Sequence, residues 1–407
     1  MKLLHTSDWH LGKRLENFSR FDEQKDVLDE ICGIADNEQV NAILIAGDLF
    51  DTFNPPTEAI DLFYKTLKRL TRNGSRPVIA IAGNHDSPDR IEAPDPLARE
   101  CGIIFAGYPN SKVVPFKLET GLRVIQSDEG FIEIAIPNCN DHLRLILLPY
   151  ANESRLRTCL NAEDTNTEMR EIIKQKWQVI ADKYCDNNGI NVLLHHMFMI
   201  SKGGEVPEEP EDEKPILHVG GTQAIYTDII PRQIQYTGAG HLHRPMTISD
   251  SVCPVVYSGS PLPYSFSEAG QEKSVIIVEV TPKEKAKYKK IKLSKGKQLY
   301  RVKFDSVDNA IQWLEDNPHT LVELTLVSDT YLNAIDKARL NDAHPAIINI
   351  IPEICSENVS ELGLKTIDLS RNISDLFVDY FKNKYGQEPN DAILSLFSEV
   401  LAVEEES

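Results

Sequence analysis

Side chains that bind metal ions recur in five short clusters along the first 243 residues of this chain. The clusters are Asp8-Trp9-His10, Gly47-Asp48, Gly83-Asn84-His85-Asp86, His195-His196 and Gly240-His241-Leu242-His243. Each cluster alone is weak evidence, because a Gly-Asp pair after a strand is usually a turn and a buried histidine is usually just hydrogen-bonded. Their occurrence together, each at the end of a predicted strand, favours one shared metal site.

A site with two divalent ions explains this mixture of carboxylates, imidazoles and an amide. Two cations about 3.5–4 Å apart repel each other, so an anionic ligand must bridge them. Asp48 is the natural bridge, and Gly47 lets the backbone approach closely. The other ligands divide into Asp8, His10 and His243 for one ion and Asn84, His196 and His241 for the other. Oxygen and imidazole ligands without thiolate suit Mn, Fe or Zn, and such a pair activates water and clamps a phosphoryl group for in-line attack.

Hydrophobic periodicity predicts the elements that position these clusters. Short apolar strands at Lys2–Thr6, Ala42–Ala46 and Val78–Ala82 each end in one of the first three clusters. Two segments with apolar residues at helical spacing, Phe21–Ala35 and Ala59–Leu70, separate the strands. This alternation predicts an α/β fold of parallel strand–helix–strand units, whose ligands gather at the carboxyl ends of the strands.

The pattern changes twice after this α/β region. Later strands are typical of a sandwich, at 143–148, 191–194, 234–237, 254–257 and 274–280. From about residue 298 a small α/β pattern follows, with strands at 299–304, 321–327 and 346–351 and helices at 307–315 and 331–340. Two amphipathic stripes, 373–381 and 393–401, predict a pair of tail helices. We therefore expect three domains: 1–280, 281–350 and 351–407.

Charge weighs against a nucleic-acid partner for the whole chain, but not for every part of it. The formal net charge is −19, whereas phosphate contacts come from Lys and Arg. Residues 351–407 hold twelve acids against four bases, and a further acidic run lies at 205–213 in a predicted loop. Residues 283–303, in contrast, carry ten Lys or Arg and one acid. Two interpretations of this basic segment stay open: a hairpin that faces DNA, or a solvated two-stranded connector.

The sequence gives no sign of a membrane span or of a secreted fold. No apolar run approaches the 18 or so residues that a membrane span needs, and Asp8 interrupts the segment where a signal peptide would stay apolar. The seven cysteines are scattered and form no CxxC pair, which is typical of free thiols. We expect a cytoplasmic protein.

The clusters resemble the signature of the calcineurin-like metallophosphoesterase superfamily. A closer resemblance, to the SbcD family, rests on residues 4–12 (LHTSDWHLG), 46–51 (AGDLFD) with Pro55-Pro56, 240–245 (GHLHRP) and 257–261 (YSGSP). It implies a four-layer αββα sandwich with a small capping domain and a C-terminal helix pair. It also implies a Mn-dependent nuclease, a double-strand exonuclease and hairpin endonuclease in DNA end processing, repair, recombination and replication. An SbcC-type ATPase, bound by the tail helices in a heterotetramer, and a homodimer contact through the helix at 57–70 are implied too.

The resemblance also implies roles for single residues. The metal ligands are Asp8, His10, Asp48, Asn84, His196, His241 and His243. His85 contacts the phosphate and protonates the leaving oxygen; the alternative is that it holds Asp48 in place. Adjacent residues of a strand point to opposite faces, so only one of His195 and His196 should reach the metals, and the resemblance implies His196. We interpret Asp86 as a turn or supporting carboxylate and His5 as a core histidine, and Asp51 takes the place of a histidine found in archaeal and eukaryotic relatives. Lys13 and Arg14 are candidates for contact with a DNA phosphate.

Two other functions share parts of this pattern. A phosphodiesterase of small nucleotides would use every metal ligand, but it would not need the domain after residue 280 or the tail helices. A scaffold without metals would have lost several ligands, and none is missing here. Both alternatives are therefore disfavoured.

Overall fold

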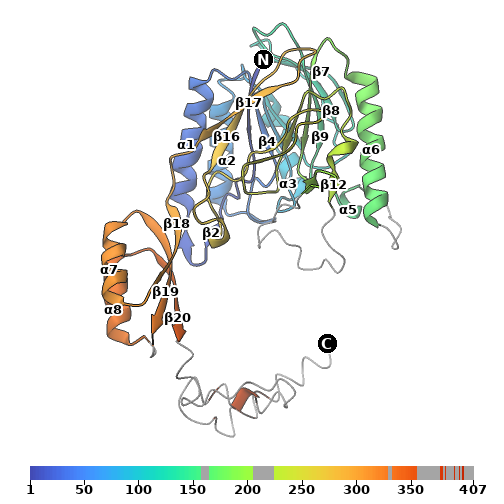
Figure 1. The fold of residues 1–407 in the computed structure, drawn as a ribbon. Helices are drawn as coiled ribbons and strands as arrows, with labels where there is room; N and C mark the ends of the chain where they lie inside the picture. The colour runs from blue at the N-terminus through green and yellow to red at the C-terminus, as the bar shows by residue number, and fades with distance from the viewer. Residues whose placement is uncertain are drawn as a thin grey trace. The chain divides into compact units, whose positions relative to one another are not determined.

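A computed structural model of the chain describes residues 1–156, 165–204, 224–328 and 332–354, with a few single positions in the tail. Contacts divide the chain into two units, Met1–Leu326 with Ala334–Ile351, and Val327–Asn333 with Pro352–Ser407. The first unit contains both large sheets (Figure 1). The predicted acidic loop at 205–213 and most of both tail helices lie outside the described residues.

The first sheet has six strands in the order β17-β16-β1-β4-β5-β6. Four of them run parallel: β1 (Lys2–Thr6), β4 (Ala42–Ala46), β5 (Val78–Ile81) and β6 (Ile103–Ala106). The antiparallel pair β16 (Ser274–Glu279) and β17 (Lys287–Lys292) completes the edge beside β1. The connecting helices α1 (Phe21–Asn37) and α2 (Thr57–Leu70) confirm the predicted strand–helix alternation.

The second sheet has seven strands in the order β14-β15-β13-β10-β9-β8-β7. Its parallel centre consists of β9 (Leu143–Leu148), β10 (Ile190–His195), β13 (Tyr236–Ala239) and β15 (Val255–Tyr257). Antiparallel strands flank it: β7 (Arg123–Asp128), β8 (Phe131–Ala135) and β14 (Met246–Ser249). The sandwich-like strands predicted after residue 140 all fall in this sheet or in β16.

Strand alternation explains the stacking of these layers. In β4, Ile43 and Ile45 pack in the cluster that includes α1 and α2, while Leu44 between them packs in a cluster shared by both sheets. On the far side of the second sheet, residues of α6 (Thr165–Tyr184) such as Trp177 pack against β9 and β10. The order is therefore helices, sheet, sheet, helix, which confirms the expected αββα sandwich (Figure 1).

A smaller three-stranded sheet follows, in the order β18-β19-β20. Its elements agree with the predicted small α/β pattern: β18 (Gln298–Phe304), α7 (Val307–Asp316), β19 (Thr320–Ser328), α8 (Ala334–Ala343) and β20 (Ile347–Ile354). Leu299 and Leu321 of this sheet share a small apolar cluster with Leu15 and Phe266. The remaining short elements are β2 (Arg14–Leu15), β3 (Phe18–Ser19), α3 (Pro88–Glu92), α4 (Asp95–Glu100), α5 (Glu153–Leu156), β11 (Met199–Ile200) and β12 (Ile225–Tyr226).

The two strands of the basic segment 283–303 do not pair as a hairpin, which excludes the first of the two interpretations that the sequence left open. β17 pairs with β16 in the first sheet, and β18 pairs with β19 in the small sheet. A run of lysines indicates exposure but does not select a pairing partner, and the apolar side chains Tyr288 and Ile291 instead pack β17 onto the two large clusters. The first sheet consequently extends beyond residue 280. Among the described helices, none has the length and apolar character to span a membrane.

Candidate metal centre

The clusters meet because the strands that precede them end side by side. Asp8 follows β1, Asp48 follows β4 and Asn84 follows β5, and these strands are parallel neighbours. Backbone hydrogen bonds continue past the strand ends, from Asp8 N to Gly47 O at 2.9 Å and from His10 N to Asp48 O at 3.0 Å. The second sheet supplies His196 after β10 and His241 after β13. These side chains therefore lie at the carboxyl ends of parallel strands in both sheets, as predicted.

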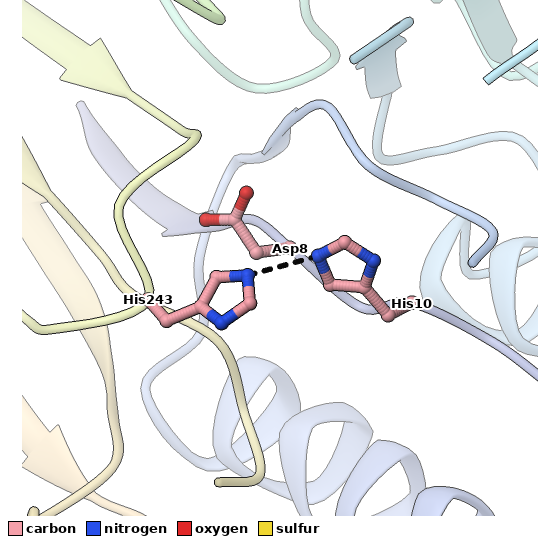
Figure 2. Close-up of side chains that lie close together, drawn as sticks. All are labelled: Asp8, His10 and His243. Carbon is pink, nitrogen blue, oxygen red and sulfur yellow. Dashed lines mark hydrogen bonds between the residues drawn. The ribbon is translucent and has the colours of Figure 1, made fainter. Parts of the chain in front are cut away.

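One group of ligand atoms comprises Asp8, His10 and His243, all within 4.8 Å of one another. The Nε2 atoms of His10 and His243 face each other at 3.0 Å, with the Asp8 carboxylate beside them (Figure 2). All three side chains are buried. The Nδ1–H of His243 donates to Oε1 of Glu268 at 3.1 Å, so its Nε2 is the nitrogen available to a metal ion.

A second group comprises Asp8, Asp48 and His196. His196 Nδ1–H donates to the Ala46 carbonyl at 2.7 Å, which directs Nε2 toward two oxygens, Asp48 Oδ2 at 3.1 Å and Asn84 Oδ1 at 2.9 Å. His241 Nδ1 lies 3.2 Å from the same Asn84 oxygen. Asp8 belongs to both groups. The same Oδ2 atom of Asp48 that faces His196 also lies 3.7 Å from His10 Nε2.

This donor set fits a pair of divalent ions. Ligand atoms that surround an ion at about 2.1 Å with right angles between them stand about 3 Å apart, which is the spacing between the His10 and His243 nitrogens and around His196. Burial raises the pKa of Asp8 to about 6. Burial acts to lower the pKa of His196, but the charges of Asp48 and Asp8 raise it to about 9. Both groups therefore bind protons more tightly than usual in the metal-free protein.

The backbone at the strand ends is held in strained conformations. Asp8, His10 and Asp48 have φ values of 53°, 43° and 47°, in the left-handed region that side chains rarely adopt. A Cβ on Gly47 would lie 2.2 Å from His196 Nδ1, and one on Gly83 would lie 2.0 Å from Asp48 Oδ1. The glycines before these ligands are therefore required by close approach, as expected for Gly47.

His85 forms a third group of possible ligand atoms with His10 and Asp51, which is less buried than the other two. Its backbone N–H donates to Asp48 Oδ1 at 2.9 Å, and its ring Nδ1–H donates to the Asp51 carbonyl at 2.8 Å. The ring packs edge-on against His10 with centroids 4.9 Å apart. The Nδ1 hydrogen bond holds the ring in place, while the backbone contact supports Asp48.

Asp86 shapes the loop that carries Asn84 and His85. Its buried carboxylate accepts the N–H groups of Gly83, Leu49 and Phe50 at 2.8–3.0 Å, which confirms its interpretation as a turn and supporting carboxylate. Burial and the nearby Asp48 charge raise the pKa of Asp86 to about 6.

The remaining sequence candidates separate clearly. His195 is buried against Trp177 and Tyr257, and His5 hydrogen-bonds to the Tyr236 hydroxyl at 2.9 Å; burial lowers the pKa of each histidine to about 3. His5 is therefore a core histidine, as predicted. His196, and not His195, lies with the other ligand candidates.

Lys13 lies near the centre, with Nζ 3.1 Å from Asp51 Oδ1 and above the Tyr264 ring. Asp51 Oδ1 is also 3.8 Å from His10 Nδ1. Arg14 lies in β2, exposed, and donates to the Asn17 carbonyl. The structure thus brings Lys13, but not Arg14, to the edge of the metal centre.

Several supporting residues were not found from the sequence. Glu268 and Lys273 form a buried ion pair behind His243, and Lys273 Nζ also donates to the His243 carbonyl at 2.9 Å. Arg155 donates to the carbonyls of Gly83 and Asp86 at 2.7 and 2.8 Å. Glu268, Lys273 and Arg155 lie outside the segments with regular apolar spacing. The one sequence signal that could have indicated them is a charged residue among apolar neighbours.

Comparisons show that the chain is similar to known proteins over most of its length. The calcineurin-like phosphoesterase family matches residues 1–244. Over 415 aligned residues the chain is 36% identical to SbcD of the SbcCD nuclease of Bacillus subtilis, with 100% of this chain and 99% of that protein covered. It is 27% identical to the protein of the same name from Staphylococcus epidermidis, covering 98% and 99%. The counterpart from Rhodobacter capsulatus is 32% identical and covers 69% and 66%.

Proposed function

We infer the function from family membership: the chain belongs to the calcineurin-like phosphoesterases and, among them, to the SbcD proteins of SbcCD nucleases. We propose accordingly that it is a metal-dependent DNA nuclease, a double-strand exonuclease and hairpin endonuclease that acts with an SbcC-type ATPase in DNA end processing, repair, recombination and replication. The observation that carries the proposal is the meeting of two carboxylates, four imidazoles and an amide at strand ends of both sheets.

The proposed ligands of two divalent ions are Asp8, His10, Asp48, Asn84, His196, His241 and His243. We assign Asp48 as the bridge, because it lies between His10 of one group and His196 of the other. When bound, the ions lower the pKa of water and stabilise charge on the phosphoryl oxygens. Mn²⁺ is our choice of ion, since the mixed oxygen and imidazole donors suit it and the family resemblance implies it.

His85 is the proposed general acid. Its Nδ1–H is held by the Asp51 carbonyl, so a proton on Nε2 is the one to be given to the leaving oxygen of the cleaved phosphodiester. Lys13, held by Asp51 at the edge of the centre, is positioned to contact a phosphate oxygen. Arg14 stays a weaker candidate because it lies in β2, where its side chain donates to the Asn17 carbonyl.

Cleavage of two substrates in parallel tests the proposal. The purified chain, loaded with Mn²⁺, should hydrolyse bis(p-nitrophenyl) phosphate, and with its ATPase partner it should degrade linear duplex DNA and open DNA hairpins. Chelation by EDTA should abolish both activities. Hydrolysis of small diesters and cyclic nucleotides without any cleavage of DNA would contradict the nuclease proposal and favour the small-nucleotide phosphodiesterase.

Partners and domains extend the proposal. The expected boundary of the phosphoesterase domain at residue 280 would cut off β17 (Lys287–Lys292), which pairs with β16 in the first sheet. We therefore propose a phosphoesterase domain that runs to residue 292, in place of the expected 1–280, followed by a capping domain that shapes DNA access and ends at about residue 350. We propose that the tail at 351–407 binds the ATPase through its two amphipathic stripes. We further propose a homodimer with a contact through α2, a heterotetramer with the ATPase, and a cytoplasmic location, which the free thiols of the described cysteines support. Removal of residues 365–407 should abolish co-purification with the ATPase and leave diester hydrolysis intact; co-purification at full stoichiometry would contradict the tail assignment.

A further inference from the structure

Two adjoining hollows of about 610 Å³ and 230 Å³ lie beside the loop that carries His241 and His243. They share a wall formed by residues 270–273 and Lys292. We call the pair the basic groove and define it by its exposed or half-buried cations, Arg244, Lys290, Lys292, Lys295 and Lys297. Among the described residues that line the groove, Glu272 is the one carboxylate. In a chain of net charge −19, this concentration of positive charge requires an explanation.

Alternation along β17 sends its lysines to two different faces of the first sheet. Lys290 and Lys292, which pair with Ile276 and Ser274 of β16, line the basic groove. Lys289 points the other way and pairs at 2.9 Å with Glu38, which directly follows α1. Lys287 lines a separate hollow near the N-terminus. One strand thus carries a groove-facing pair of lysines and a matched pair that faces elsewhere.

Arg244 and Lys290 are neighbours without a carboxylate partner. Lys290 Nζ donates to the Pro245 carbonyl at 2.9 Å, and within the described part of the chain neither cation forms an ion pair. Burial and the Arg244 charge lower the pKa of Lys290. Two adjacent cations without a counter-charge are unfavourable in the protein alone, and a bound polyanion would relieve their repulsion.

The groove adjoins the metal centre through the same loop. Arg244 directly follows His243, one of the proposed ligands, and Lys273 Nζ reaches the His243 carbonyl at 2.9 Å while it lines the groove. An anionic chain that occupies the groove therefore passes next to the residues that surround the metal centre.

We propose that the basic groove binds the sugar–phosphate backbone of a DNA strand beside the cleaved bond, with Arg244 and Lys290 as its principal phosphate contacts. The inference rests on the proposed nuclease function and names where its substrate is held. Such contacts carry no sequence preference, because they address phosphates and not bases.

The test compares two double variants of the full-length, Mn²⁺-loaded chain. In R244Q/K290Q the groove loses two charges; in K287Q/K289Q the same number is removed from the other face of β17. Affinity for a linear duplex with phosphorothioate linkages is measured by fluorescence anisotropy over a range of salt concentrations. Each lost phosphate contact should reduce the slope of log affinity against log salt by about 1, so R244Q/K290Q should lose about 2 and the control variant close to none.

Hydrolysis of bis(p-nitrophenyl) phosphate by both variants reports whether the metal centre has folded. The groove variant should lose at least ~10-fold more activity on DNA than on this small diester. An unchanged salt slope in R244Q/K290Q, or an equal loss in K287Q/K289Q, would overturn the groove assignment. If the wild-type chain with its ATPase cleaves no DNA, the proposed function fails, and the salt slopes still decide separately whether the groove binds a DNA backbone.

Discussion

The ring of His243 is held by the carboxylate of Glu268, which accepts its Nδ1–H at 3.1 Å in a region closed to solvent. Glu268 in turn accepts the Tyr264 N–H at 3.1 Å and pairs with the buried Lys273. Burial acts to raise the pKa of Glu268, yet Lys273 and His243 hold it well below its usual range. Glu268 is therefore an anion that fixes the tautomer and orientation of one proposed ligand.

Replacement of Glu268 by Gln should weaken metal binding by about 10–100-fold, the usual effect of removing a partner that orients a ligand histidine. Isothermal titration with Mn²⁺ measures this directly. In E268Q the buried Lys273 would lose its ion-pair partner. The double variant E268Q/K273M also removes this lysine. It should show the same loss of Mn²⁺ affinity as E268Q if the effect comes from His243 and not from misfolding. E279Q, an exposed change at the end of β16, is the control. Unchanged affinity in E268Q would show that His243 does not depend on this carboxylate.

Asp48 should determine whether the centre holds two ions or one. Asn at this position keeps an oxygen that can accept the His85 N–H, which donates to Asp48 at 2.9 Å, but it removes the bridging charge. We expect D48N to fold, to bind at most one equivalent of Mn²⁺ by calorimetry and to lose phosphodiester cleavage. Two full equivalents in D48N would exclude Asp48 as the bridge.

The seven proposed ligands could be found from the sequence because each one closely follows an apolar strand. Short apolar runs predicted those strands and helical spacing predicted the helices between them, and parallel topology then required the carboxyl ends of the strands to meet. Glu268 and Arg155 could not be found in this way, since the partner of a buried charge depends on segments far apart in sequence. Glu268 is 25 residues from His243, and Arg155 is 72 from Gly83.

The same reason explains why the sequence left two interpretations open for residues 283–303. Net charge predicted an exposed segment, but the pairing of β17 with β16 depends on how Tyr288 and Ile291 pack on clusters built by distant residues. Charge patterns predict which residues face water, whereas pairing is decided by tertiary contacts.

His85 should act in proton transfer more than in metal binding. We expect H85Q to retain both equivalents of Mn²⁺ while cleavage falls by ~10²–10⁴-fold, the usual contribution of a general acid. Parallel loss of metal and activity would instead assign His85 to the support of Asp48.

The metal-free protein should lose stability as pH rises from about 7 to 9. The folded-state pKa of His196 is raised to about 9, above its ordinary value of 6.5, so its contribution to stability is complete below pH 6.5 and is lost as pH passes 9. Asp8, with its pKa raised to about 6, has already lost its proton and its contribution by pH 7. Thermal denaturation of the EDTA-treated chain at pH 7 and 9 measures the change.

Two controls identify the source of this pH dependence. Saturating Mn²⁺ should remove most of it, since the ions replace the protons, and H196Q should flatten the curve of the metal-free protein. A melting temperature of the metal-free chain that rises between pH 7 and 9 would contradict the charged state assigned to His196. Below pH 6.5 the buried His5 and His195, with pKa values lowered to about 3, act in the opposite direction, so the comparison belongs above that pH.

Arg155 should fix the position of the loop that carries Asn84 and His85. Its guanidinium is buried, lies over the Tyr150 ring and donates to the carbonyls of Gly83, Asn84 and Asp86 at 2.7, 3.3 and 2.8 Å. A lysine keeps the charge but lacks the planar fork that reaches several carbonyls at once.

We expect R155K to lower kcat on the small diester by roughly 10²-fold with a smaller change in KM, because a displacement of about 1 Å at a catalytic group has that effect. R155M should lose more activity than R155K. A partial rescue of kcat by lysine would show that Arg155 positions the loop and does not merely fill space. The Mn²⁺ titration supplies a second readout, since a displaced Asn84 should lower the affinity for one of the two ions and leave the affinity for the other unchanged. E153Q, an exposed change on the same short helix α5, should match the wild type in both measurements. An equal loss of affinity for both ions, together with a lower melting temperature, would mean that Arg155 stabilises the fold and does not position the loop of Asn84 and His85.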